Sequence, residues 1–116
     1  MFPTSGKAGG LRISLFVARG QFSQERCFRV AEWIEHLALS GWRHWVLDFT
    51  DAGHVDFRGF ERLLRTARLL ETTGGAFCWC GMSPYLRDIS LVAGAHDRPV
   101  YPDSRAAVMG LEVVAA

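Results

Sequence analysis

Apolar residues along the first half of the chain follow two periodicities, one typical of strands and one typical of helices. Alternation over residues 11–18 predicts a strand, and the apolar run at residues 45–49 predicts a second strand that is buried on both faces. Spacings of three and four residues follow each strand, within 23–40 and 57–71, and predict amphipathic helices.

The second half of the chain repeats this order with shorter strands. The predicted elements are a strand in residues 76–82, a helix that starts at Ser83 and Pro84, a short edge strand in 98–102, and a helix from Asp103 or Ser104 to about Val113.

Strands that alternate with helices of ten or more residues predict an α/β domain with a mainly parallel sheet. Residues 11–116 are enough for one such domain, and no repeat or second domain is visible. Residues 1–10 are rich in glycine and small polar residues, and we expect them to form a flexible lead-in.

Composition narrows the possible functions. The chain has 116 residues and a formal net charge of +1, which predicts no general attraction to nucleic acid or to an anionic membrane. Its start lacks the apolar core of a signal peptide, and no segment is long and apolar enough for direct membrane insertion, so we expect a cytoplasmic protein. Three cysteines, an odd number, favour reduced thiols over a disulfide framework.

Candidate catalytic chemistry is sparse, so the protein is not expected to be an enzyme. Cys78 and Cys80 lie two residues apart on a predicted strand and point the same way, but no histidine or cysteine stands nearby at ligand spacing. Buried core thiols explain the pair better than an enzyme that uses it, although the enzyme hypothesis can be tested with a thiol reagent. No phosphate-binding glycine motif occurs, and the four histidines are scattered. We therefore expect no catalytic residue, metal or cofactor.

The sequence HVDFRGFERLL, residues 54–64, joins the second predicted strand to the second predicted helix. We expect Asp56 to cap that helix through its side chain. Arg58 follows at the helix start, where free backbone N–H groups favour an acidic partner residue or a phosphate. By helical angle Arg58, Arg62 and Arg65 form a basic stripe, which is either a solvated face or a partner-binding surface.

Phe57 allows two interpretations. An exposed aromatic residue beside an arginine is typical of a binding hot spot. The same side chain could instead fold back onto the core.

Most of the chain, about residues 11–112, resembles the STAS domain family, the fold of bacterial anti-sigma factor antagonists. The resemblance depends on features in a fixed order. These are a central strand ending in Asp48, a loop and helix with Asp56, Gly59, Phe60 and Leu63, a glycine pair at 74–75, a Ser83–Pro84 helix closing on Gly94, and the tail HDRPVYPDSRAA. Upstream, Gly20 and Phe22 are similar to the family's Gly-x-Leu turn.

The resemblance implies a mainly parallel sheet of four to five strands with about four helices. It also implies a non-catalytic module that binds a protein, in transcription regulation or signalling. In phospho-switched members the loop reads Asp-Ser-Ser-Gly or Asp-Ser-Thr-Gly, and a partner kinase phosphorylates the second hydroxyl. Here Phe57 and Arg58 stand in those positions, so no phosphorylation is expected there. The family's first strand would be short, absent or irregular.

From this resemblance, the expected partner is an anti-sigma factor or a kinase-like ATPase, bound through the loop 51–58 and the helix 58–71. The expected contact residues are Asp56, Phe57, Arg58, Gly59, Arg62 and Arg65. The alternative is a STAS-type accessory subunit of a lipid ABC transporter complex. Exposed aromatic residues also allow a homodimer.

Overall fold

The computed structural model describes the backbone of residues 4–8 and 11–115, and the side chains of residues 12–111. In chain order the elements are β1 (Thr4–Ala8), β2 (Leu11–Phe22), α1 (Gln24–Leu39), β3 (His44–Val55), α2 (Phe57–Glu71), β4 (Ala76–Cys80), α3 (Pro84–Val92), β5 (Val100–Tyr101) and α4 (Ser104–Ala115). The predicted α/β class is confirmed.

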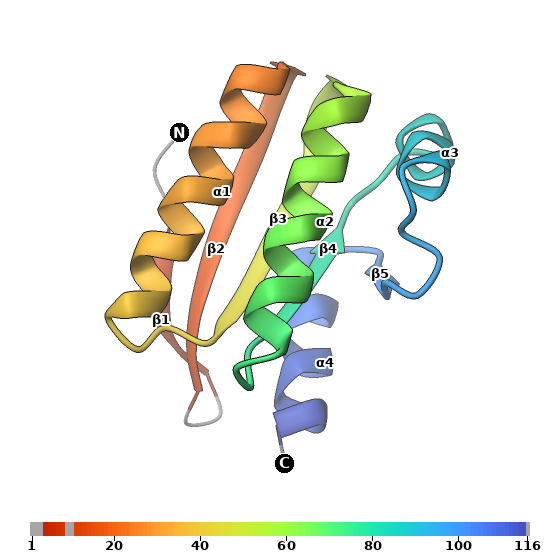
Figure 1. Ribbon diagram of the computed structural model, residues 1–116. Coiled ribbons are helices and arrows are strands. Elements are labelled where there is room, and N and C mark those ends of the chain that lie inside the picture. The colour runs from red at the N-terminus through yellow and green to blue at the C-terminus, as the bar shows by residue number, and fades with distance from the viewer. Residues whose placement is uncertain (1–3, 9–10, 116) are drawn as a thin grey trace.

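The five strands form one sheet in the order β1-β2-β3-β4-β5. β1 runs antiparallel to β2, and every other neighbouring pair is parallel. Helices α1 and α2 lie side by side over one face of the sheet, α4 lies on the other face, and α3 stands apart at one edge (Figure 1).

Two apolar cores follow from this layering. The larger lies between the sheet and the α1–α2 pair, and includes Phe16, Ile34, Leu47, Phe60 and Trp79. The smaller lies under α4. It is built from side chains of the opposite strand face, among them Val46, Cys78 and Cys80, together with Ala107 and Leu111 of α4. The two-residue period of each strand therefore divides its side chains between the two cores.

Helix starts follow the predicted capping residues. The side chains of Ser23 and Ser83 accept hydrogen bonds from the backbone N–H groups of Arg26 and Leu86, at 3.3 and 3.2 Å. At the last helix, Asp103 is the residue that caps, because its Oδ1 accepts from the N–H of Ala106 at 2.8 Å.

Two predictions about the strands need correction. Residues 4–8, part of the predicted lead-in, form β1, so a first strand is present ahead of β2 and it is short. The rest of the predicted lead-in, residues 1–3 and 9–10, lies outside the described residues. β2 and β3 also continue past residues 18 and 49, pairing through two register shifts as far as Phe22 and Val55. The burial of Phe22 and Val55 accounts for this extension.

Candidate functional site

The extension of β3 places the start of α2 beyond the end of the sheet. Most of the predicted loop 51–58 is therefore strand, and Asp56 alone separates β3 from α2. The N–H of Asp56 donates to the carbonyl of Phe22 at 3.1 Å, which ties the junction to the end of β2. Its Oδ1 accepts from the N–H of Gly59 at 3.1 Å. The predicted cap is confirmed.

Gly59 is required by a close approach between two helices. A Cβ atom at this position would lie 2.4 Å from Sγ and 2.7 Å from Cβ of Cys27 on α1, well inside van der Waals contact. The first turn of α2 thus lies directly against α1. This contact fixes the direction in which the next exposed side chains of α2 point.

Phe57 and Arg58 occupy that exposed first turn. The Phe57 side chain keeps 40% of its surface accessible, so it is not folded into the core. Arg58 is exposed and forms no ion pair with any residue whose side chain is described. The junction therefore presents an aromatic ring beside an unpaired cation.

A hollow of about 460 Å³ lies between this turn and α3. Its lining residues are His54, Val55, Asp56, Phe57, Tyr85, Asp88, Ile89 and Val92. Tyr85 and Val92 are 53% and 76% exposed, so apolar surface continues from Phe57 across to α3. The Nδ1 of His54 lies 2.7 Å from the Tyr85 hydroxyl and joins the end of β3 to the first turn of α3.

The α3 side of the hollow was missed at the sequence level. The sequence pattern predicts a buried face of Leu86, Ile89, Val92 and Ala93 for this helix, but Val92 is exposed, so that assignment is wrong for Val92. The signal that could have found the hollow is Tyr85, a large aromatic residue outside the predicted buried face, which is also exposed.

Arg62 differs from the other two arginines of the predicted basic stripe because it is held in an ion pair. Its guanidinium binds both carboxylate oxygens of Glu35 on α1, at 3.0 and 3.2 Å, and contacts the Thr66 hydroxyl. This hydrogen bonding is the main cause that lowers the pKa of Glu35, and the charge of nearby Arg65 adds to it. Arg62 therefore joins α1 to α2, while Arg58 and Arg65 stay exposed without an ion pair among the described side chains.

The three cysteine side chains are buried and reduced. Burial raises the pKa of Cys27, Cys78 and Cys80 to about 12, so their nucleophilic thiolate forms are suppressed at neutral pH. Among the residues that the structure describes, no group of three or more His, Cys, Asp or Glu side chains could hold a metal ion.

Within the described part of the chain, no helix combines the length and the apolar character needed to cross a bilayer.

Comparison with known proteins gives a consistent result at the level of the fold. No protein-family model and no curated protein sequence matches the chain. Among solved structures, RsbS from Moorella thermoacetica matches with a TM-score of 0.76 at 15% identity, over 97% of each chain. Phosphorylated SpoIIAA from Bacillus matches with a TM-score of 0.69 at 14% identity, over 95% of this chain and 99% of that one. The STAS domain of a SulP transporter from Vibrio cholerae matches with a TM-score of 0.67 at 18% identity, over 90% and 85%. With its sheet order, its layering and the capped strand-to-helix junction at Asp56, the chain has the fold of the STAS domains.

Proposed function

We propose that this protein is a non-catalytic binding module of the anti-sigma factor antagonist type. It acts in the cytoplasm and binds an anti-sigma factor or a kinase-like ATPase. The docking surface is the start of α2 with the hollow beside it, and it reaches along α2 to Arg65. Because positions 57 and 58 carry no hydroxyl, the interaction is not switched by phosphorylation there.

The observation that carries this proposal is the pairing of Phe57 and Arg58 with the apolar hollow. An accessible aromatic ring next to a pocket offers a buried anchor at the centre of an interface, and a neighbouring arginine offers directed hydrogen bonds. The partner that fits has an apolar side chain to enter the hollow and a carboxylate to meet Arg58. Free N–H groups at the start of α2 add to the attraction for that carboxylate.

The structural neighbours support this class of function. Two matching structures are of SpoIIAA, which is described as an anti-sigma factor antagonist and is known in phosphorylated and unphosphorylated forms. A third belongs to the stressosome, a signal integration and transduction hub. Arg58 stands at the position where phospho-switched members carry the hydroxyl that is phosphorylated. In this protein that position therefore has a permanent positive charge and no removable phosphate.

The test is affinity capture from cytoplasm of the source cells, comparing wild type with Arg58→Glu. We expect one regulatory protein to be retained by wild type and reduced roughly tenfold or more by the variant, because the new carboxylate repels the partner's acid. Arg105→Glu on α4 is the matched control, since Arg105 is also exposed and lacks an ion pair among the described side chains. Equal capture by Arg58→Glu and wild type would overturn the proposed docking surface.

A second candidate function is an accessory subunit of a lipid ABC transporter complex. The observation in its favour is that the same fold occurs in transporters, including the SulP domain and murine Slc26a9, an anion transporter. The same capture experiment decides between the two candidates. Retention of a transporter ATPase with its membrane subunit would support the second, and retention of a soluble regulator alone would support the first.

A further inference from the structure

We propose that the outer groove between the C-terminal halves of α1 and α2 is a dimer interface, in which it binds the same groove of a second copy of this chain. The groove lies near the C-terminal end of α2, whereas Phe57 and Arg58 lie at its start. The inference therefore goes beyond the proposed partner site and does not depend on it.

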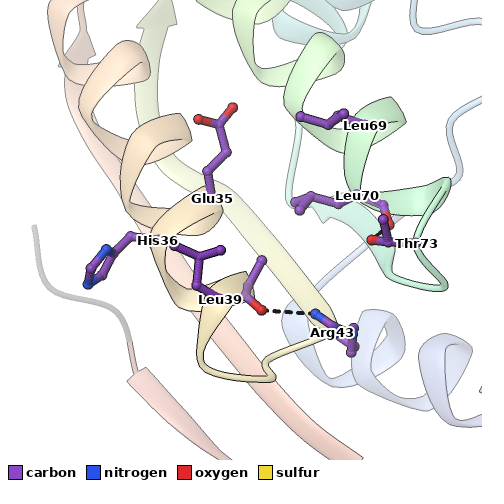
Figure 2. Close-up of a pocket in the computed structure, with 8 residues that line it drawn as sticks. Glu35, His36, Leu39, Arg43, Leu69, Leu70 and Thr73 are labelled. Atoms are coloured by element: carbon purple, nitrogen blue, oxygen red, sulfur yellow. Dashed lines mark hydrogen bonds between the residues drawn. The ribbon is translucent and has the colours of Figure 1, made fainter.

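The groove is open and largely apolar. Its hollow measures about 630 Å³ and is lined by Glu35, His36, Ala38, Leu39, Arg43, Leu69, Leu70 and Thr73. Leu39 and Leu69 lie on its opposite sides, on α1 and α2 (Figure 2). They are 87% and 57% exposed, and Leu39 is the most exposed large apolar side chain among those described. A partner that covers both leucines removes this apolar surface from water.

The charges around the groove limit what can cover it. Arg43 donates from one guanidinium nitrogen to the carbonyl of Ala38 at 2.9 Å and has no carboxylate partner among the described side chains (Figure 2). Glu35 does not supply that carboxylate, because it is bound to Arg62. The occupant must therefore bring an acidic group to Arg43 as well as apolar surface to Leu39 and Leu69.

Helix α1 itself carries the acid that would complete such a contact. Glu32 is exposed and forms no ion pair with a described residue. It lies seven residues before Leu39, which is about 10 Å along the helix axis, and by helical angle the two are on neighbouring positions of one face. Arg43 follows the C-terminal end of α1, in the turn before β3, and its hydrogen bond to the carbonyl of Ala38 holds its guanidinium beside that end. An unpaired acid therefore lies N-terminal to the exposed leucine, and an unpaired base lies at the C-terminal end of the helix.

This arrangement is self-complementary about a two-fold axis. If two α1 helices cross antiparallel near Leu39, each Leu39 enters the other copy's groove beside Leu69, and Glu32 of each copy meets Arg43 of the other. Such a contact is isologous and closes at two copies, unlike a head-to-tail contact that would continue into a filament. The patch is small, so we expect a reversible dimer whose population depends on concentration.

The test is sedimentation of the purified protein from micromolar concentrations to about 1 mM, which detects dimers with dissociation constants up to that range. We expect wild type to move from the 12.9 kDa monomer toward twice that mass. Leu39→Glu and Arg43→Glu should each raise the dissociation constant at least tenfold. The charge swap Glu32→Arg with Arg43→Glu should restore dimerisation, because it rebuilds the same ion pair with its signs reversed. Circular dichroism of each variant checks that it is folded.

Two controls separate this interface from other surfaces. Met109→Glu on α4 changes another exposed apolar side chain and should leave the dimer unchanged. Arg58→Glu should also leave it unchanged, so failure of the partner-binding proposal would not affect this one. A wild-type protein that stays monomeric at every concentration, or a charge swap that restores nothing, would overturn the proposal. Capture of an unrelated protein that depends on Leu39 in a monomeric chain would assign the groove to that protein instead.

Discussion

At the scale of single residues, the position of the site depends on Gly59, which has no Cβ atom. Gly59 allows the first turn of α2 to pack on Cys27, and Phe57 and Arg58 are presented from that turn. We expect Gly59→Ala to lower the free energy of unfolding by about 1–3 kcal/mol, the usual cost of overpacking, because the added methyl must displace α2 from α1. Urea denaturation measures this change.

Gly53→Ala is the matched control for that prediction. A Cβ atom at Gly53 meets nothing within 4 Å, and its backbone is not in the left-handed region. The free energy of unfolding of the Gly53→Ala variant should stay within about 0.5 kcal/mol of the wild-type value. If Gly59→Ala were equally neutral, the contact with Cys27 would not determine where α2 begins.

Some features at this scale could be predicted from the sequence and others could not. The caps at Ser23, Asp56 and Ser83 are local, since each side chain reaches a backbone N–H three residues ahead. The role of Arg62 is not local, because its partner Glu35 is 27 residues away and on another helix. Helical angle alone grouped Arg62 with Arg58 and Arg65, and only the packing of α1 against α2 separates them.

At the scale of elements, the Glu35–Arg62 pair joins α1 to α2 and makes their contact sensitive to acid. The pKa of Glu35 in the folded protein is below its ordinary value of 4.5, mainly because Arg62 donates hydrogen bonds to the ionised carboxylate. A lowered pKa means that this stabilisation is present above about pH 4.5 and is lost as the pH falls through the folded-state value.

We expect Glu35→Gln to be less stable than wild type at pH 7, and the difference to shrink as the pH falls below 4.5. Urea denaturation of both proteins between pH 7 and pH 3 measures it. Glu25→Gln is the control, because Glu25 forms an exposed pair with Arg29 within one helix, and such pairs contribute little. A difference for Glu35→Gln that does not change with pH would mean that its ionisation does not strengthen the α1–α2 contact.

The elements also show where prediction from sequence stops. Hydrophobic periodicity and turn residues predict the order of strands and helices correctly, but they predict ends for β2 and β3 that come several residues too early. Residues 50–54 contain aspartate, alanine and glycine, which are weak strand formers, and they are extended because β2 and β3 pair there. The five residues of β1 were assigned to a loop for a similar reason, since their composition is poor in apolar residues and their order comes from pairing with β2.

At the scale of the whole molecule, the two proposed surfaces lie at opposite ends of the α1–α2 layer. The hollow beside Phe57 adjoins α3 at one end, and the groove beside Leu39 lies at the other. A dimer formed through the groove would therefore leave both partner sites open. Two copies held together would also bind a dimeric regulator with higher apparent affinity than one copy, without any new contact.

The buried thiols report on the stability of the whole domain. Cys27 lies in the core under α1, while Cys78 and Cys80 lie in the core under α4, so no small opening exposes all three. Their pKa of about 12 means that they contribute stability up to about pH 9, the ordinary thiol value, and that this stability is lost as the pH rises from there toward 12.

At pH 8 we expect a thiol reagent to react with the folded protein at least about a thousandfold more slowly than with the urea-unfolded chain. Mass spectrometry of the modified peptides should show the three sites rising together with urea, because only global unfolding exposes both cores. Rapid modification of Cys78 or Cys80 in the folded protein would instead show that the layer under α4 opens separately, and would make the cysteine pair a candidate for chemistry again.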